Sequence, residues 1–335
     1  MYNFVKESKS ENDKSVTSTY MSLVKQACSL VGKTNVILNG EKPSNKLHYI
    51  VCDTIQTSFQ YFVRGYRNQI VWLQGVVPEE SYMRRHSKIR FSVLSFMEKY
   101  VLKHCKLLLM VSVEMLDHYE KKYKLLLRDK TIIMPCFNEN EIVESAFIDE
   151  KYKTNTFLYV GGMAKWQCFE QIVQVYKKIE DIDPSSMFYV YTFDKRTAEN
   201  IIKTNNIKNY SVEYVRKEEL SEKIKGIKYG FVLRENCTVN NVATPTKFSN
   251  YIANGIIPIY SSALKSFSKV ALENEVGIIC DLDDLELGIK NISEHLRKNI
   301  SAIDIKDKCR TIFKTYYNQK EYVKIIHQKL LQLNL

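Results

Sequence analysis

Short β-rich runs alternate with helical patterns along the whole chain. Many repeats of strand, helix and strand predict parallel sheets built from β-α-β units. A chain of 335 residues is too long for one ordinary core and suits two domains. The predicted strands are 35–39, 48–52, 69–74, 107–112 and 131–135 in the first half, and 156–160, 187–192, 211–215, 229–233, 256–260 and 277–280 in the second.

The boundary between the halves is predicted after Pro135, which ends the last strand of the first half. The next stretch, 136–154, is acidic and weakly periodic, as in an interdomain connection. The segment 316–335 has apolar residues at helical spacing and predicts a final amphipathic helix. We therefore expect an α/β protein with doubly wound domains at 1–140 and 155–315. They would face a cleft, with the ligand at the carboxyl edges of the strands.

The composition excludes several classes of protein. A hydrophobic fraction of 45% and a charged fraction of 26% are those of a soluble globular protein. No apolar run approaches the ~20 residues that span a bilayer, and the N-terminus lacks the apolar core of a signal peptide. The cysteines and histidines are scattered, so we expect reduced, mostly buried thiols in a cytoplasmic protein, with no metal site and no cofactor. We find no nucleic-acid-binding motif and expect no nucleic-acid partner.

The formal charge of +11 is concentrated in one segment. From Arg84 to Lys106 there are seven lysines and arginines and a single acid, Glu98. Apolar residues recur there at helical spacing, at 89, 93, 96, 100 and 107. A basic amphipathic helix of this kind suits an anionic membrane surface. A core helix with a solvated basic face explains the pattern equally well.

The second half contains a polar loop between two buried strands. The loop runs from Arg234 to Pro245, and Thr246 and Lys247 then open a helical pattern that Gly255 ends. Open α/β sheets bind ligands at the carboxyl ends of their strands. A helix start adds unpaired N–H groups and the positive end of a dipole. With the full charge of Lys247, these features predict an anion site, and phosphate is the commonest biological anion.

Gly161 and Gly162 form the only adjacent pair among the 11 glycines. They directly follow the predicted strand at 156–160, where glycine lets backbone N–H groups approach a phosphate or a sugar. An ordinary tight turn between strand and helix is the alternative interpretation. The chain has no GxGxxG and no GxxxxGK[ST], so it supports neither a dinucleotide fingerprint nor a Walker loop.

Together these two segments resemble the donor half of GT-B nucleotide-sugar glycosyltransferases. The resemblance is to retaining, family 4-like enzymes of bacterial surface polysaccharide synthesis, and it covers roughly residues 68–335. The first half matches more loosely, through IVWLQGVVPEES (70–81), LLMVSVEMLDHYEKKY (108–123) and TIIMP (131–135). It implies two Rossmann-like domains and a last helix, 316–335, that crosses back to the first domain. The residues that match the second-half pattern are Arg234, Asn240, Pro245, Thr246, Lys247, Phe248, Tyr251, Ala253, Gly255 and Pro258.

The resemblance also implies roles for individual residues. Lys247 and Arg234 would stabilise the departing diphosphate, with Thr246 beside them, and no metal ion would be needed. Gly161 and Gly162 would open the way to the phosphates. The remaining donor-side residues implied in this way are Lys165, Asn240 and Asn250.

Two departures from the family pattern concern ribose binding and the acceptor side. Family 4 enzymes usually carry two glutamates eight positions apart, where this chain has Val242 and Asn250; an asparagine can still hydrogen-bond a ribose hydroxyl. Many relatives have a histidine where this chain has Gln74, before Gly75. The remaining acceptor-side candidates are Glu79, as an orienting group, and Glu80, as a base or orienting group; a solvated helix start is the alternative for both. Trp166 and Gln167 lie where a lid over the donor could form.

The leading hypothesis is a metal-independent hexosyltransferase at the inner face of the cell membrane. It would move a hexose from a nucleotide diphosphate sugar, with UDP preferred, to a lipid-linked glycan or polysaccharide, with retention. The segment from Arg84 to Lys106 would dock on anionic lipid. A catalytically silent GT-B subunit that binds a partner or a glycan is the alternative, and a GT-B epimerase or phosphorylase is a third.

Overall fold

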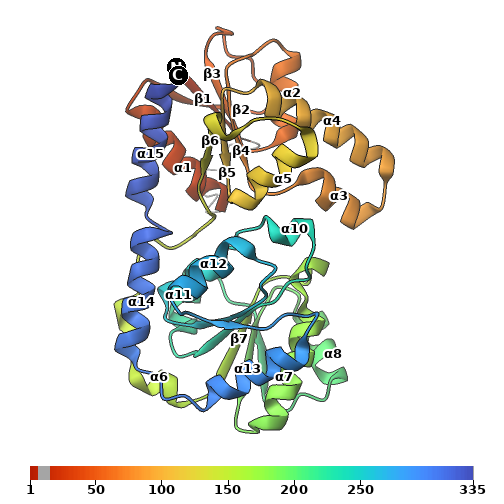
Figure 1. The fold of residues 1–335 in the computed structure, drawn as a ribbon, viewed down its shortest axis with the longest axis vertical. Coiled ribbons are helices and arrows are strands. Elements are labelled where there is room, and N and C mark those ends of the chain that lie inside the picture. The colour runs from red at the N-terminus through yellow and green to blue at the C-terminus, as the bar shows by residue number, and fades with distance from the viewer. Residues whose placement is uncertain (7–15, 335) are drawn as a thin grey trace. The chain divides into compact units, whose positions relative to one another are not determined.

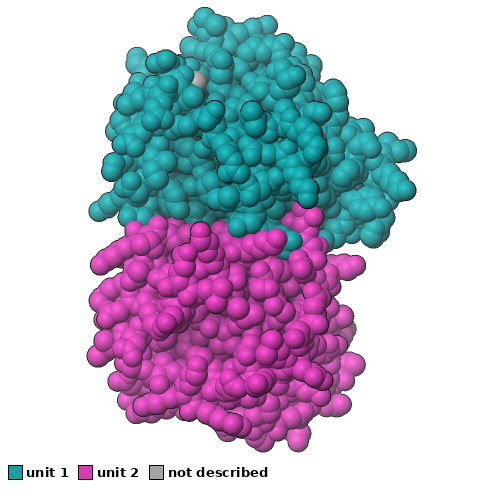
Figure 2. Space-filling view, in the orientation of Figure 1, with its two compact units in different colours: residues 1–136, 241–244, 318–335 teal, residues 137–240, 245–317 magenta. Residues whose placement is uncertain are grey.

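The computed structural model describes residues 1–6 and 16–334. The chain forms two compact units (Figure 2). Unit 1 comprises Met1–Cys136, Asn241–Thr244 and Asn318–Leu335, and unit 2 comprises Phe137–Asn240 and Pro245–Tyr317. Each unit contains one six-stranded sheet.

Unit 1 is built on a parallel sheet in the order β2-β1-β3-β4-β5-β6. Its central strands β4 and β5 are buried along their whole length, as in a parallel sheet covered on both faces. Strand β1 is absent from the sequence prediction, because a five-residue run before a polar stretch carries little periodic signal. It nevertheless pairs with both β2 and β3. The strands are β1 (Tyr2–Lys6), β2 (Thr34–Leu38), β3 (Tyr49–Cys52), β4 (Gln69–Leu73), β5 (Leu107–Met110) and β6 (Thr131–Ile133).

The helices of unit 1 begin at side-chain caps in several places. Thr54, Ser87 and Ser112 each accept a hydrogen bond from a backbone N–H in the first turn of α2, α4 and α5. The last helix, α15, packs against α1, so the predicted return of the C-terminal helix to the first half is confirmed (Figure 1). The helices are α1 (Val16–Ser29), α2 (Ile55–Val63), α3 (Val77–Arg85), α4 (Lys88–His104), α5 (Val113–Tyr123) and α15 (Gln319–Gln332).

Unit 2 has a parallel sheet in the order β12-β11-β10-β7-β8-β9. The strand order reverses between β7 and β10, the arrangement of a doubly wound dinucleotide-binding sheet. Stacked aromatic rings fill the core at this point, with Phe157 of β7 between Tyr229 and Phe231 of β10. The strands are β7 (Thr156–Val160), β8 (Met187–Tyr191), β9 (Tyr210–Glu213), β10 (Tyr229–Val232), β11 (Ile257–Tyr260) and β12 (Ile278–Ile279).

The segment expected to be a connection, 136–154, packs into unit 2 along most of its length. Its short helix α6 buries Lys151 and Tyr152, and Tyr152 donates a hydrogen bond to the Gly255 carbonyl oxygen at 2.8 Å. The acidic composition of the segment therefore gave no indication that it packs into unit 2. The helices of unit 2 are α6 (Asp149–Lys153), α7 (Phe169–Ile182), α8 (Lys195–Thr204), α9 (Lys217–Ile224), α10 (Thr238–Asn241, ending in unit 1), α11 (Lys247–Ala253), α12 (Lys265–Glu273), α13 (Leu285–Leu296) and α14 (Ala302–Thr315).

The predicted α/β class with two doubly wound parallel sheets is confirmed. All eight cysteines are free thiols, and all but Cys237 are buried, as expected of reduced core cysteines. In the stretches 1–6 and 16–334, no helix combines the length and the apolar character needed to cross a membrane.

Candidate functional site

The strand reversal in unit 2 brings the predicted donor-side residues to one edge of the sheet. Gly161 and Gly162 follow β7, and Arg234 lies two residues beyond the end of β10, the neighbouring strand. Lys247 begins α11, which follows the loop after β10. The carboxyl edge at the reversal point is where doubly wound sheets bind ligands.

Lys247 lies directly over the glycine turn. Gly161 has a φ of +152°, and a Cβ atom added to it would lie 2.8 Å from Lys247 Nζ. The same ammonium group lies 4.5 Å from the centroid of the Tyr159 ring, a cation–π distance. Tyr159 in turn donates a hydrogen bond to the Gly162 carbonyl oxygen at 2.6 Å. The absent side chain of Gly161 therefore leaves the room that the Lys247 ammonium group occupies.

Arg234 is the second cation of the site and is only 4% exposed. Its backbone N–H donates to Ser261 Oγ at 3.0 Å, which fixes the chain after β10 to the end of β11. Its guanidinium group donates to the Leu233 carbonyl oxygen at 2.7 Å and to the Gln167 side chain at 2.8 Å. Lys247 Nζ donates to the same Gln167 oxygen at 2.7 Å.

Both cations are held without an anionic partner. Within residues 1–6 and 16–334, no carboxylate forms an ion pair with Arg234 or with Lys247. Burial, followed by repulsion from Arg234, lowers the pKa of Lys247 well below its ordinary value. Burial also lowers the pKa of Arg234. Buried charge is costly unless it is paired, so this edge of unit 2 favours an anionic ligand.

Helix α11 is held against β10 by a close approach at a glycine. A Cβ atom on Gly230 would lie 2.5 Å from the Tyr251 ring, so the ring lies flat over the strand only because Gly230 has no side chain. The helix ends as predicted, at Gly255, with a left-handed φ of +62°. It is only seven residues long, and Thr246 makes no side-chain cap. A helix this short adds little to the predicted anion site, which therefore depends mainly on Lys247 and Arg234.

Asn250 carries a buried acceptor on this helix. Its side-chain carbonyl oxygen has no hydrogen-bond partner in the part of the chain that the structure describes. Asn240 differs, since its amide nitrogen donates to the Glu235 carbonyl oxygen at 2.9 Å and holds its own loop together. Lys165 is exposed in a single turn of 3₁₀ helix after the glycine pair.

The glycine turn of unit 1 follows β4 and contains the acceptor-side candidates. Gln74 is exposed, and the Glu80 carboxylate lies over Gly75, where an added Cβ atom would be 2.0 Å from Glu80 Oε1. Burial raises the pKa of Glu80, as a proton-transfer group requires. Glu79 instead pairs with Lys122 Nζ at 2.8 Å and with His118 Nε2 at 3.1 Å. Although burial raises the pKa of Glu79, hydrogen bonds from His118 and Lys122 bring it below its ordinary value. Glu79 therefore belongs to an ion-pair network, and Glu80 is the more available carboxylate.

The basic segment from Arg84 to Lys106 is not the single helix that its spacing predicts. Helix α3 ends at Arg85, His86 takes a left-handed conformation with a φ of 50°, and Ser87 caps the start of α4. A left-handed residue followed by a new cap ends one helix and begins another. The predicted apolar position 107 lies on β5 instead. Figure 1 shows α3 and α4 side by side at the outer edge of unit 1.

The apolar stripe predicted on this segment faces solvent along α4. Ile89, Val93 and Phe96 are 81%, 54% and 64% exposed, whereas Leu94, Val101 and Leu102 are buried against the unit. All seven lysines and arginines between positions 84 and 106 are exposed. Helix α4 therefore packs inward through a different set of apolar residues and has a solvated basic face, while three positions of the predicted stripe remain exposed.

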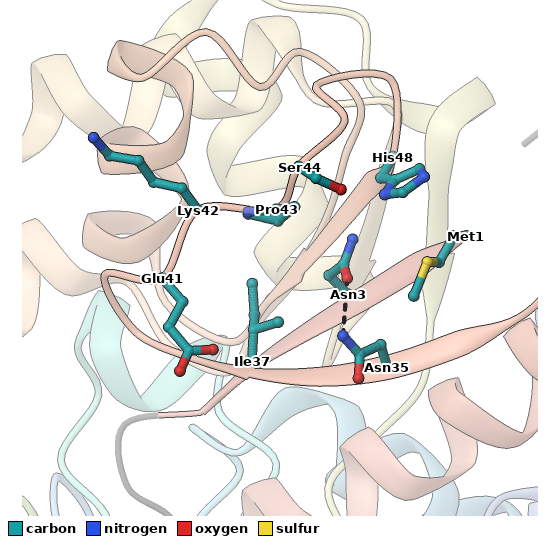
Figure 3. A pocket seen from close by; sticks show the side chains of 9 residues that line it. All are labelled: Met1, Asn3, Asn35, Ile37, Glu41, Lys42, Pro43, Ser44 and His48. Atoms are coloured by element: carbon teal, nitrogen blue, oxygen red, sulfur yellow. Dashed lines mark hydrogen bonds between the residues drawn. The ribbon is translucent and has the colours of Figure 1, made fainter.

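A separate hollow of about 220 Å³ lies elsewhere in unit 1 (Figure 3). Asn3, Asn35 and His48 line it at the amino ends of β1, β2 and β3, together with residues of the β2–β3 loop. Asn35 donates to Asn3 Oδ1 at 3.5 Å. This edge is opposite to the carboxyl edge of the sheet, so the hollow does not coincide with the acceptor-side candidates.

Two residues of the donor-side cluster were not assigned a role there from the sequence. Tyr159 is one of two aromatic residues in β7, and nothing in the sequence distinguishes it from Phe157. Gln167 was considered only as part of a lid, although it contacts both cations. A signal did exist for Gln167, because it follows the glycine pair closely. Its partners, however, lie 67 and 80 positions away in the sequence.

Comparison with solved structures identifies the architecture. The chain superposes on a glycosyltransferase involved in lipopolysaccharide biosynthesis, WaaG, with a TM-score of 0.68 and 11% identity over 97% of this chain and 99% of that one. It superposes on sucrose-phosphate synthase from Thermosynechococcus elongatus with a TM-score of 0.71 and 13% identity, over 99% and 98% of the two chains. The chain has the GT-B fold. A third GT-B protein, S. aureus TarM in complex with UDP, matches with a TM-score of 0.62 and 12% identity.

The TarM comparison covers 87% of this chain but only 56% of that protein, so the chain spans little more than half of its length. No protein-family model matches the chain, and no curated protein sequence matches it. The likeness to the GT-B proteins is thus one of fold, at identities of 11 to 13% for the three structures named above.

Proposed function

We propose that this protein is a glycosyltransferase that uses a nucleoside diphosphate sugar as donor. The observation that carries the proposal is a pair of cations beside Gly161 at the strand reversal of unit 2, the buried Arg234 and the partly buried Lys247, which have no carboxylate partner among the described residues. A diphosphate has the charge that this cluster lacks. The GT-B neighbours support the assignment, because TarM was solved with UDP and WaaG is a glycosyltransferase.

The proposed chemistry is displacement of a nucleoside diphosphate from the anomeric carbon of the sugar. The bond between that carbon and the diphosphate oxygen breaks, and the oxygen keeps the electron pair. Lys247 and Arg234 stabilise the negative charge that develops there, which is commonly the largest catalytic contribution. The new bond joins the anomeric carbon to an acceptor oxygen, whose proton goes to a carboxylate. Side chains supply the positive charge in this proposal, so no metal ion is required.

We assign the finer donor contacts to α11 and the turns beside it. Asn250 presents a buried acceptor oxygen to a ribose hydroxyl, in the position where related enzymes have a glutamate. Thr246 and Lys165 border the diphosphate, and Asn240 keeps the loop before α11 in shape. We propose UDP as the nucleotide, a hexose as the sugar, and retention as the stereochemical outcome.

Unit 1 is the proposed acceptor-binding domain. Gln74 and Gly75 form the turn after β4, and Glu80 lies over that turn with a raised pKa suited to taking the acceptor proton. Glu79 contributes by fixing the start of α3 through its pairs with Lys122 and His118. We propose a lipid-linked glycan or a polysaccharide as the acceptor, at the cytoplasmic face of the cell membrane.

The exposed face of α4 supports the membrane part of this proposal. Ile89, Val93 and Phe96 lie at i, i+4 and i+7 and so share one face of the helix. Exposed basic residues lie before and after them along α3 and α4. Apolar side chains enter the headgroup boundary while lysines and arginines each gain about 1 kcal/mol at an anionic surface. The occupant we propose is an anionic lipid bilayer.

Vesicle sedimentation tests this surface. The protein should bind vesicles that contain phosphatidylglycerol and should not bind neutral phosphatidylcholine vesicles. Phe96→Ser should weaken the binding. Leu126→Ser is the matched control, because Leu126 is 96% exposed elsewhere on unit 1. Equal binding to both lipids, or equal loss in both variants, would contradict the docking surface.

A donor titration tests the enzymatic proposal. UDP and UDP-sugars should raise the melting temperature of the protein and bind measurably by calorimetry, with GDP-sugars as the comparison. Release of UDP in the presence of a membrane glycan extract would then demonstrate transfer. Binding without turnover would instead favour a catalytically silent GT-B subunit, and no binding of any sugar nucleotide would end the proposal.

A further inference from the structure

One neutral oxygen is shared by Arg234, which is buried, and Lys247, which is partly buried. Gln167 Oε1 accepts a hydrogen bond from Lys247 Nζ at 2.7 Å and one from Arg234 Nη2 at 2.8 Å. The Gln167 backbone carbonyl oxygen accepts a further bond from Arg234 Nη1 at 3.3 Å. A single glutamine therefore provides three acceptor contacts to a site that carries two positive charges.

An amide is a poor final partner for such a pair. It accepts hydrogen bonds but contributes no negative charge, so the repulsion between the two cations remains. Burial lowers the pKa of both groups, and repulsion from Arg234 lowers the pKa of Lys247 further. Hydrogen bonds from a cation to an anionic oxygen are shorter and about twice as strong as bonds between neutral groups. An anionic oxygen would therefore gain the most binding free energy at the position that Gln167 Oε1 occupies.

Gln167 lies on a short turn whose contacts with Arg234 and Lys247 are made by Gln167 itself. It is the last residue of the single 3₁₀ turn Lys165–Gln167, which follows the Gly161 and Gly162 turn by two residues. The next residue, Cys168, has a φ of 52°, a left-handed conformation that is uncommon for a residue other than glycine. The turn has few backbone hydrogen bonds of its own, Gln167 N–H to the Ala164 carbonyl oxygen and Cys168 N–H to the Lys165 carbonyl oxygen.

We propose that Gln167 is an internal substitute for the donor's diphosphate, and that an anionic oxygen of the ligand displaces it from Arg234 and Lys247. The displacement releases the Lys165–Gln167 turn, which carries Trp166. Gln167 thereby keeps the two cations together in the absence of ligand and competes with the ligand for them. The diphosphate as the physiological anion rests on the proposed function, whereas the exchange itself requires only an anion with several oxygens.

Two substitutions with opposite expected effects test the exchange, with inorganic pyrophosphate as the probe. Gln167→Glu places a permanent carboxylate between the cations, so it should raise the melting temperature of the ligand-free protein. It should also weaken pyrophosphate binding by about ten- to a hundredfold, the effect of competing charged hydrogen bonds. Gln167→Met keeps the length of the side chain but removes the acceptor. It should lower the ligand-free melting temperature and leave pyrophosphate affinity equal to or higher than that of the wild type.

The pair of variants separates a substitute from a direct ligand contact. If Gln167 itself binds the anion, Gln167→Met weakens pyrophosphate binding, and the proposal is overturned. A lower ligand-free melting temperature for Gln167→Glu overturns it as well, because the carboxylate would then not satisfy the cations. Failure of the wild-type protein to bind pyrophosphate would also overturn the proposal.

Fluorescence of Trp166 reports on the release of the turn. Pyrophosphate should change the emission of the wild-type protein with the affinity that calorimetry gives, and Trp166→Phe should abolish the change. The other tryptophan, Trp72, is fully buried in unit 1 and provides a constant background. Binding by calorimetry without a change in Trp166 emission would overturn the release of the turn.

The outcome is distinguishable from failure of the proposed function. Pyrophosphate exchange with the predicted variant effects, together with no binding of UDP-sugars, would leave the exchange standing and remove the glycosyltransferase assignment. Turnover of a UDP-sugar together with weaker pyrophosphate binding by Gln167→Met would confirm the glycosyltransferase assignment and overturn the exchange.

Discussion

The two units treat buried charge in opposite ways. In unit 1, Glu98 has no exposed surface and is surrounded by donors: Lys122 Nζ at 3.0 Å, Tyr123 Oη at 2.5 Å and Tyr119 Oη at 3.2 Å. In unit 2, Arg234 is nearly as deeply buried and has only neutral acceptors. Both units carry these charges close to a glycine turn at the carboxyl edge of the sheet.

The difference separates a structural charge from a functional one. Tyr119 Oη lies 3.1 Å from the Gly75 carbonyl oxygen and 3.2 Å from Glu98 Oε1, and its one proton is shared between the two, so the network of unit 1 helps to fix its turn in place. The oxygens of Glu98 already have donors within unit 1, so this network gains little from a ligand, although Lys122 is shared with Glu79 and burial raises the pKa of Glu98. The cations of unit 2 do not balance, and a ligand that supplies the missing charge gains that energy. An unpaired buried charge is therefore the better sign of a binding site.

Lys151 is a buried cation of unit 2 that has a structural role instead of a binding role. It is 3% exposed and has no carboxylate partner in the part of the chain that the structure describes, but it donates to the Asn254 carbonyl oxygen at the end of α11. A cation is favourable at the C-terminus of a helix. Lys151 thus has a structural use, and its position explains why no ligand is needed there.

The largest effect is expected from breaking the paired network of unit 1. Glu98→Ala removes the acceptor for Lys122 and two tyrosines and should lower the free energy of unfolding by about 3–5 kcal/mol. Urea unfolding measures the change, and Asp129→Asn, at an exposed position of unit 1, is the control. UDP affinity of the folded variant should stay near that of the wild type. A stability close to that of the wild type would mean that the network is not structural.

The next effect is expected at the unpaired cations of unit 2. Lys247→Met should lower the rate of glycosyl transfer by about 100- to 1000-fold, or 2.7–4 kcal/mol of transition-state stabilisation. The same substitution should leave the ligand-free protein as stable as the wild type or more stable, because a buried charge is removed. Kinetics and thermal melting measure the two effects. Lys269→Met, at an exposed position of unit 2, should change neither. Destabilisation of the ligand-free protein by Lys247→Met would make the lysine structural and end the contrast between the units.

A smaller effect concerns the pH dependence of stability. Burial lowers the pKa of Lys151 from 10.5 to about 7 and that of Lys228 to about 8. Between the folded and unfolded values the unfolded chain holds more protons, so stability should rise as pH increases from about 7 to about 8.5, by up to about 1.4 kcal/mol per pH unit for each proton. Buried thiols such as Cys309, with its pKa raised to about 12, reverse the trend only where unfolded thiols ionise, near pH 9.

Urea midpoints at about pH 7 and about pH 8.5 measure this dependence. Lys151→Met should flatten the rise, while Lys121→Met, at an exposed position of unit 1, should leave it unchanged. A stability that falls over this interval would show that the buried lysines keep their ordinary pKa values.

The smallest effect is expected at the ribose contact. Asn250→Ala should weaken UDP binding by about 0.5–1.5 kcal/mol, the net value of one hydrogen bond. It should have no effect on binding of pyrophosphate, which has no ribose. Asn250→Glu should bind UDP at least as well as the wild type does, because a carboxylate accepts a stronger hydrogen bond. Calorimetry with both ligands separates the ribose contact from the diphosphate contact, and equal losses for both ligands would contradict the assignment.

Much of the fold was predictable because its signals are local. Apolar runs such as 156–160 match β7 residue for residue, and Gly255 ends its helix as the sequence indicates. The errors also have local causes. The run before the polar segment that begins near residue 7 was too short to distinguish as β1. In the basic segment the apolar residues keep a continuous helical spacing, so the sequence did not predict the break between α3 and α4 at His86 and Ser87.

The candidate site was predictable only in part. The rule for the carboxyl edge brings Gly161, Arg234 and Lys247 together from the sequence alone, since it depends on strand order in a parallel sheet. It does not indicate which charges find partners. Glu79 and Glu80 are adjacent and chemically identical in the sequence, yet one is paired with Lys122 and the other lies over Gly75.

The sequence by itself determined the alternation of strands and helices, the edge at which the chain collects its polar residues, and the positive sign of the charge there. Only the tertiary structure decided that Glu98 is surrounded by donors, that Arg234 and Lys247 have no carboxylate partner among the described residues, and that Gln167 lies between them. The physical reason is that periodicity and turn chemistry act over a few neighbouring residues. Charge compensation instead depends on side chains 24 to 80 positions apart, which meet only when the sheet has formed.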